Sequence, residues 1–227
     1  MHKGIFITGT DTGVGKTEVG VQIAASLTAA SIPVTARKPV ESGCTIVTGQ
    51  LRPADAARYF AALTGGTPLD SICTFRLAAA LAPPIAAQRE SIALTLEQLI
   101  DAARPDPDRF TIVEGAGGFL SPIAENALNA DLATALGLPV LLVAADRLGC
   151  INHVLLTLEA IANRNLNVAG VVLSEVDPAL SLPDNLPGLR RWQPHPVTPL
   201  PHGEKLDVIT LFSLLGHPLE SLYHRIG

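Results

Sequence analysis

The sequence predicts a single doubly wound α/β domain over residues 1–227, built on a mostly parallel sheet. Two patterns predict this class: short Val/Ile/Leu-rich runs of strand length recur along the chain, and segments with helical apolar spacing separate them. The composition agrees, because 48% of the residues are apolar and only 16% are charged, which favours a packed core over a disordered chain. No internal repeat or charge run suggests a second domain.

The first half of the chain alternates strands with helices. A strand is expected at Gly4–Thr8, and the following helix places Val19, Ile23 and Leu27 on one face. The next expected elements are a strand near Val34–Arg37, helices over Pro53–Leu63 and Thr95–Ala103, and a strand at Phe110–Glu114. Such alternation predicts parallel strands joined by right-handed crossovers.

The second half continues this pattern. Buried strands are expected at Pro139–Ala144 and Val168–Leu173, and the helix between them has an apolar face made of Ile151, Val154, Leu155, Leu158 and Ile161. Seven of the 18 prolines lie between Pro178 and Pro201, so we expect one irregular excursion there. A last helix is expected from Leu206 towards Tyr223.

Several partner classes are not expected. A formal net charge of −5 offers no cationic footprint for nucleic acid. Polar residues and a proline interrupt Val19–Ala36, the longest uncharged stretch, so we expect no membrane segment. Met1–Lys3 leads straight into a strand without a signal-peptide region, which predicts a cytoplasmic protein. Three widely spaced cysteines, Cys44, Cys73 and Cys150, predict reduced thiols rather than disulfides or a zinc site.

A phosphate-binding loop follows the first strand, with the sequence GTDTGVGKT at Gly9–Thr17. Glycines let backbone N–H groups turn inward around a phosphate, and the positive end of the next helix adds charge. Five residues separate Gly9 from Gly15, one more than in the usual GxxxxGK pattern, so the loop is a variant. We therefore expect a P-loop NTPase-like fold that binds a nucleotide through Gly13, Val14, Gly15, Lys16 and Thr17.

Four further motifs follow in order: KPVESG at Lys38–Gly43, LRPADA at Leu51–Ala56, VEGAGG at Val113–Gly118 and LGCINH at Leu148–His153. With the phosphate loop, they resemble the dethiobiotin synthetase family over residues 4 to about 175. The resemblance implies an ATP-dependent ligase of biotin biosynthesis. In this family 7,8-diaminopelargonate takes up CO2 as a carbamate, ATP phosphorylates it to a carbamic-phosphoric anhydride, and the second amine closes the ring to give dethiobiotin, ADP and phosphate.

The resemblance gives catalytic roles to Lys38, Lys16, Thr12 and Ser42. Lys38 would hold the carbamate with help from Ser42, and Thr12 would contact the reacting groups of the substrate. The residue types suit the chemistry, because a carbamate and a triphosphate crowd anions together and need fixed cations. Lys16 and Lys38 would supply those cations.

Magnesium is the expected metal, because it takes oxygen ligands from carboxylates, hydroxyls, phosphates and water. Thr17, Asp55 and Glu114 match the family's positions for that role. Glu114 also ends an apolar strand, where a carboxylate is costly without an accompanying cation. Glycines allow close backbone approach to a ligand, whereas a plain strand-to-helix turn, the alternative interpretation, would need fewer of them. The resemblance places nucleotide at Gly115, Ala116 and Gly117, and substrate at Gly118.

A second substrate-binding segment is expected at Gly149, Cys150, Ile151 and Asn152, which open a helix with free N–H groups for a distal carboxylate. In the family this segment reaches the active site of the other subunit, which implies a homodimer with active sites at the interface. Cys150 itself is expected to pack rather than to act as a nucleophile.

Base recognition is expected to depart from the family's pattern. An asparagine often follows the family's sixth strand, whereas this chain has Ser174 there. One hydroxyl replaces an amide that could pair with two base-edge atoms, so weaker discrimination among nucleoside triphosphates is expected. Pro201 and His202 would take the place of the family's second base-contacting loop. The segment Ala82–Ile85 lacks a frequent family histidine, so contacts to the substrate's chain are expected to differ.

Two other functions use a loop of this type. A relative of cobyric acid synthase would need a glutaminase domain with a cysteine nucleophile, for which 227 residues leave no room. A regulatory ATPase switch of the partition type would carry a second loop lysine in a KGGxGK pattern, where this chain has Thr10 and Asp11.

Overall fold

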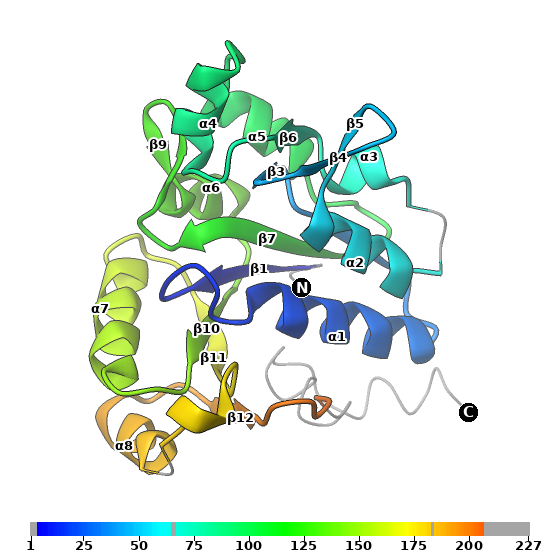
Figure 1. Cartoon of the computed structure of the whole chain (residues 1–227). Helices are drawn as coiled ribbons and strands as arrows, with labels where there is room; N and C mark the ends of the chain where they lie inside the picture. The colour runs from blue at the N-terminus through cyan, green and yellow to red at the C-terminus, as the bar shows by residue number, and fades with distance from the viewer. Residues whose placement is uncertain (1–3, 65–66, 183, 207–227) are drawn as a thin grey trace.

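A six-stranded parallel sheet forms the centre of the computed structural model, which describes residues 4–64, 67–182 and 184–206 (Figure 1). The strand order is β12-β11-β10-β1-β7-β2, and each neighbouring pair is parallel. The strands are β1 (Gly4–Gly9), β2 (Val34–Arg37), β7 (Phe110–Gly118), β10 (Val140–Ala145), β11 (Val168–Ser174) and β12 (Val197–Leu200). The predicted doubly wound α/β class is therefore confirmed.

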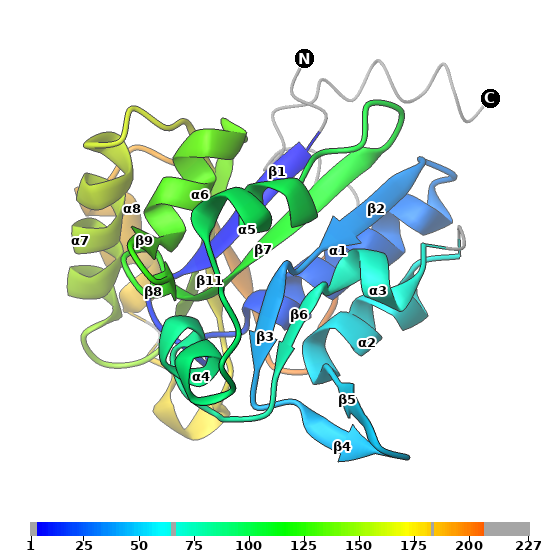
Figure 2. The same cartoon turned by 90° about the horizontal axis from the view of Figure 1, so that it is seen from above.

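Helices cover both faces of this sheet (Figure 2). Along β1, Ile5 and Ile7 pack in the same cluster as α1 (Lys16–Ala29) and α2 (Ala54–Ala62). Phe6 points to the opposite face, because side chains alternate along a strand. That face is covered by α5 (Leu96–Ala102), α6 (Asn129–Leu136) and α7 (Cys150–Ala162). The core thus consists of two apolar layers with the sheet between them.

Strand β7 continues past Glu114, where the sequence predicts its end, and runs to Gly118. The buried Asn129 side chain holds this extension. Its Oδ1 accepts the Ala116 N–H at 2.9 Å, and its Nδ2 donates to the carbonyls of Ala116 at 2.6 Å and Gly118 at 3.1 Å. The glycine segment is therefore strand rather than a turn into a helix.

The prediction of irregular structure over Pro178–Pro201 is wrong for most of that segment. The segment contains the 3-10 helix η1 (Pro178–Leu180), the helix α8 (Asn185–Trp192) and the strand β12. Pro187 lies in the first turn of α8, where a missing N–H breaks no helical hydrogen bond, and Pro199 lies in an edge strand, where proline is tolerated. The helix predicted from Leu206 towards Tyr223 lies outside the described residues.

Shorter elements complete the fold. A parallel pair joins β3 (Val40–Ser42) to β6 (Phe75–Leu77), and antiparallel pairs form β4 (Thr45–Val47) with β5 (Gln50–Arg52) and β8 (Pro122–Ala124) with β9 (Ala127–Leu128). The short helices are α3 (Leu69–Ile72) and α4 (Pro83–Arg89). In Figure 2 the β4–β5 hairpin projects away from the main sheet. Among the described residues, no helix has the length and apolar character needed to cross a bilayer.

Candidate active site

The phosphate loop joins the carboxyl end of β1 to the start of α1. Gly13 and Gly15 have φ angles of 73° and 95°, in the left-handed region that favours glycine, and Gly15 is the N-cap of α1. The Lys16 side chain folds back over this loop, and its Nζ donates a 2.8 Å hydrogen bond to the backbone oxygen of Asp11. The predicted strand, glycine loop and helix are therefore in place to surround a phosphate.

Lys16 is a buried cation, with only 7% of its surface exposed. Burial and, next, the nearby Lys38 ammonium lower the pKa of Lys16, while Glu114, Asp55 and Asp11 act in the opposite direction, and the net pKa is about 8. The two lysines thus interact electrostatically, as groups of one cluster. A bound anion would relieve the unfavourable burial of this charge.

Lys38 follows β2 and lies between two carboxylates. Its Nζ is 2.5 Å from Glu114 Oε1 and 3.2 Å from Asp55 Oδ2. Burial alone would lower the pKa of Lys38, but the two carboxylates outweigh it and raise the pKa above its ordinary value. The ammonium is therefore permanently charged at neutral pH, and it neutralises Glu114, which is 1% exposed.

Glu114 receives two further hydrogen bonds. The Thr17 hydroxyl donates to Oε1 at 2.8 Å, and the Tyr59 hydroxyl donates to Oε2 at 2.7 Å. Three sequence-predicted residues, Thr17, Lys38 and Glu114, therefore meet in one contact network, and Asp55 joins it through Lys38. Tyr59, from α2, was not among the predicted site residues.

The start of α2 is anchored by Glu41, from β3. The Glu41 carboxylate accepts the N–H groups of Asp55 at 2.9 Å and Ala56 at 3.0 Å, and so satisfies two free donors of the helix. Burial raises the pKa of Glu41, although these N–H groups partly oppose the shift. Glu41 therefore fixes the helix that carries Asp55.

Ser42, a predicted substrate contact, is the last residue of β3 and is half-buried.

The β7 glycine segment lies beside the phosphate loop. Gly117 has a φ of 81°, and a Cβ placed there would lie 3.5 Å from the Thr12 hydroxyl and 2.8 Å from Ser121 Oγ. A Cβ on Gly118 would lie 3.3 Å from the Thr10 carbonyl. The structure thus brings the predicted residues Thr12, Gly117 and Gly118 together, and the positive φ at 117 favours glycine there.

The predicted segment Gly149–Asn152 opens α7, with Gly149 as its N-cap at a φ of 89°. The loop before it reaches the phosphate loop, because an Arg147 guanidinium nitrogen lies 3.8 Å from Asp11 Oδ2. The helix end therefore lies near the edge of the same site within one chain. Leu148 in this loop is 85% exposed.

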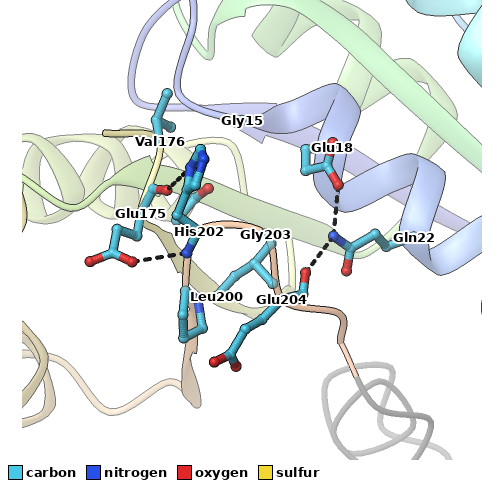
Figure 3. A pocket seen from close by; sticks show the side chains of 11 residues that line it. Gly15, Glu18, Gln22, Glu175, Val176, Leu200, His202, Gly203 and Glu204 are labelled. Carbon is cyan, nitrogen blue, oxygen red and sulfur yellow. Dashed lines mark hydrogen bonds between the residues drawn. The ribbon is translucent and has the colours of Figure 1, made fainter. Parts of the chain in front are cut away.

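A cavity of about 310 Å³ adjoins the phosphate loop at the carboxyl ends of β11 and β12 (Figure 3). Its lining includes Gly15 and the predicted base contacts Ser174, Pro201 and His202. The His202 N–H donates to Glu175 Oε2 at 2.9 Å, which fixes the two loops against each other. Glu18 and Gln22 of α1 complete the opposite wall and were not predicted. The predicted base contacts are thus brought together.

Comparisons with known proteins agree with this geometry. A family model described as an AAA domain matches residues 3–210. The ATP-dependent dethiobiotin synthetase BioD of Anaeromyxobacter dehalogenans (strain 2CP-C) is 46% identical over 178 residues, 78% of each chain. The protein of the same name from Anaeromyxobacter sp. (strain K) is 40% identical over 225 residues, covering 96% of this chain and 99% of its own. This chain belongs to the dethiobiotin synthetase family.

Membership of the dethiobiotin synthetase family confirms the predicted family and the predicted class of ATP-dependent ligase in biotin biosynthesis. The fold comparison agrees. The septum site-determining protein MinD of Pyrococcus horikoshii, solved with Mg-ADP, matches 98% of this chain and 89% of its own at a TM-score of 0.50 and 17% identity. At that identity the likeness shows the fold alone, which is the predicted P-loop NTPase type.

The donor types at this candidate site are those that a magnesium ion prefers. Within residues 4–64, 67–182 and 184–206, no three His, Cys, Asp or Glu side chains are grouped to hold a metal. One hydroxyl from Thr17 and carboxylates from Glu114 and Asp55 nevertheless match the ion's preference for a few oxygen ligands, completed by phosphate and water. Lys38 already contacts both carboxylates.

Besides Glu18 and Gln22 of the cavity wall, three residues around the lysine and glycine segments escaped the sequence-based prediction: Tyr59, Glu41 and Asn129. Each forms hydrogen bonds with a predicted site residue that lies more than ten positions away in the sequence. One signal could have found Tyr59, because it follows Asp55 by four residues and so lies on the same helix face. For Glu41 and Asn129 the sequence offers no comparable periodic signal.

Proposed function

We propose that this chain closes the ureido ring of dethiobiotin from 7,8-diaminopelargonate and CO2, with ATP converted to ADP and phosphate. The observation that carries the proposal is the meeting of Lys16, Lys38, Thr17 and Glu114 beside the carboxyl ends of β1 and β2, with Glu114 supplied by the middle of β7. Ligands of open parallel sheets bind at that edge. Family membership supplies the identity of the substrates.

In the proposed reaction, one amine of the substrate attacks CO2, forms an N–C bond and loses a proton to leave a carbamate anion. A carbamate oxygen then attacks the γ-phosphorus of ATP and breaks its bond to ADP, which gives the carbamic-phosphoric anhydride. The second amine attacks the carbonyl carbon, phosphate leaves with the C–O bond electrons, and the ring nitrogen loses a proton. Each step therefore needs fixed positive charge around moving anions.

Lys38 and Lys16 would divide that task. The Lys38 ammonium, buried beside Glu114 and Asp55, would bind the carbamate, and Ser42 and Thr12 would orient it. Lys16, folded over the phosphate loop, would hold the transferred phosphoryl group.

Magnesium would be held by Thr17, Glu114 and Asp55, and when bound it would neutralise charge on the phosphates. Gly13, Val14, Gly15 and the backbone of Gly115, Ala116 and Gly117 would line the triphosphate. The base would enter the cavity bounded by Ser174, Pro201 and His202. This orientation places the base and the reacting phosphate on opposite sides of Gly15.

We also propose a homodimer, with the second copy covering the face beside α7. Three exposed leucines, Leu120, Leu148 and Leu156, lie there, and a hollow of about 400 Å³ is lined by Leu120, Leu156 and Gly118. In such a dimer Gly149, Cys150, Ile151 and Asn152 would bind the distal carboxylate of the substrate in the partner's site. Leu156→Glu should give monomers with little turnover in analytical ultracentrifugation and activity assays.

One assay tests the proposed reaction. The purified chain is mixed with 7,8-diaminopelargonate, bicarbonate-derived CO2 and Mg-ATP, and the product is identified by mass. Dethiobiotin formed in a one-to-one ratio with ADP supports the proposal. ATP hydrolysis without dethiobiotin, at the same rate with and without the diamine, would overturn it. In the same assay Lys38→Gln should form little dethiobiotin, whereas Lys205→Gln, a change at an exposed lysine, is the control and should keep normal turnover.

A further inference from the structure

Tyr59 is a fully buried phenol beneath the site, and the proposed chemistry gives it no role. Its hydroxyl donates to Glu114 Oε2 at 2.7 Å, across 55 positions of sequence. A buried phenol needs a partner for its hydroxyl, and here the partner is the carboxylate that would bind the cation. The contact therefore joins a core residue to the reacting region.

The hydrogen bonds divide the two Glu114 oxygens between different partners. Oε1 accepts from Thr17 at 2.8 Å and from Lys38 at 2.5 Å, while Oε2 accepts from Tyr59. The terminal torsion of a glutamate has broad minima, so the carboxylate plane is not set by the side chain itself. Tyr59 fixes that plane and leaves Oε1 directed at Thr17 and Lys38.

Helix α1 is shaped to admit this hydroxyl. A Cβ on Gly20 would lie 1.7 Å from the Tyr59 phenol oxygen and 2.7 Å from its ring carbon Cζ. Glycine is disfavoured inside a helix, so its presence here is explained by the room that it leaves for Tyr59. The space beside Gly20 therefore fits the phenol oxygen closely.

Tyr59 and Asp55 also act from one helix face. They are four residues apart on α2, so both side chains point the same way. Asp55 contacts Lys38 at 3.2 Å, and Tyr59 contacts Glu114, the other partner of Lys38. Helix α2 thereby sets both carboxylates around a single cationic position.

We propose that Tyr59 is a positioning residue that orients Glu114 for the divalent cation of the reaction, an inference that rests on the proposed function. Partners that orient a metal-binding carboxylate strengthen cation binding without touching the ion. Tyr59 would act in this way through its hydroxyl alone, since its ring packs in the apolar core.

The test removes only that hydroxyl, in Tyr59→Phe. Mn²⁺ is titrated into the full chain with ADP present, and free Mn²⁺ is measured by its paramagnetic resonance signal. We expect the dissociation constant for Mn²⁺ to rise about tenfold, with ADP affinity in the absence of the ion unchanged. Thr28→Val is the control, because it removes a buried hydroxyl with no hydrogen-bond partner among the described residues, near the other end of α1.

An unchanged Mn²⁺ affinity in Tyr59→Phe would overturn the inference, as would an equal loss in Thr28→Val. Thermal denaturation of both variants shows whether the loss of Mn²⁺ affinity follows a loss of stability. If Mn²⁺ affinity fell in proportion to the melting temperature in both variants, the inference would also be overturned. The proposed function fails separately, when the unmodified chain makes no dethiobiotin. In that case a raised Mn²⁺ dissociation constant in Tyr59→Phe alone would still support the positioning role.

Discussion

The Lys38 ammonium lies 2.5 Å from Glu114 Oε1, and both side chains are almost completely buried. A buried ion pair is held by mutual compensation, so removing one partner leaves a desolvated charge on the other. Asp55, 3.2 Å from the same nitrogen, adds a second negative charge to the cluster. Lys38 therefore contributes to stability as well as to the proposed chemistry.

Lys38→Gln should lose most turnover and also lower the free energy of unfolding. The neutral amide cannot compensate Glu114 and Asp55, so a loss of about 3 kcal/mol is expected in urea denaturation. Nucleotide affinity should stay close to normal, because Lys16 and the phosphate loop remain. Lys205→Gln should change neither turnover nor the free energy of unfolding. Near-normal turnover in Lys38→Gln would contradict the role of this lysine.

Thr17→Val and Glu114→Gln should raise the magnesium concentration needed for half-maximal turnover, by about tenfold or more. Thr17→Val removes a hydroxyl ligand and Glu114→Gln removes the negative charge of a carboxylate ligand at the proposed cation site, where the two side chains are 2.8 Å apart. The measurement is turnover against magnesium concentration at saturating ATP. An unchanged magnesium dependence in both variants would show that the ion binds elsewhere.

Ser174 should permit several bases in the cavity next to Gly15. The buried serine offers one hydroxyl, so kcat/KM values for ATP, GTP and CTP are expected to agree within about tenfold. Ser174→Asn should shift the preference towards ATP, since an amide can pair with two base-edge atoms. A strong preference of the unmodified chain for ATP would count against this account.

The three cysteines should resist alkylation in the folded protein. Burial raises the pKa of Cys44 to about 11 and that of Cys73 to about 12, and it also raises the pKa of Cys150. A raised pKa keeps each thiol protonated at pH 8, and only the thiolate reacts. Iodoacetamide labelling at pH 8 should be about a hundredfold slower than in urea-unfolded protein. Rapid labelling of folded Cys150 would revive a nucleophilic role.

Gly20→Ala should destabilise the fold although alanine favours helices. The new methyl would lie 1.7 Å from the Tyr59 phenol oxygen, and the overpacking is expected to cost about 1–3 kcal/mol. Adding Tyr59→Phe removes that oxygen, so the double variant should recover about 1 kcal/mol relative to additivity. Strictly additive losses in chemical denaturation would show that the two residues do not interfere.

The sequence predicted the large elements well because their signals are local. Buried apolar runs located β1, β10 and β11, and helical spacing located α1 and α7. Three-residue strands are too short to show a period, so β3 and β6 were not predicted. The proline count misled the assignment of Pro178–Pro201, which contains α8 and β12, because it ignored where in an element each proline lies.

The site residues show the same contrast between local signals, which the sequence carries, and contacts that depend on tertiary packing. Lys16, Lys38 and Glu114 belong to compact motifs, and the structure brings them together at one edge of the sheet. Tyr59 was missed because its partner lies 55 positions away, and hydrogen bonds of that kind depend on tertiary packing. Asn129 was missed for a similar reason, since it stabilises β7 from the start of α6.

The Glu41 carboxylate accepts the N–H groups of Asp55 and Ala56 in the first turn of α2, and the β4–β5 hairpin lies between Glu41 and that helix along the chain. The carboxylate closes this loop at its base, so the length of the hairpin does not determine where Asp55 lies. The turn at Thr48 and Gly49 is consequently a suitable place to insert a reporter peptide or a fluorophore attachment site without moving the active centre.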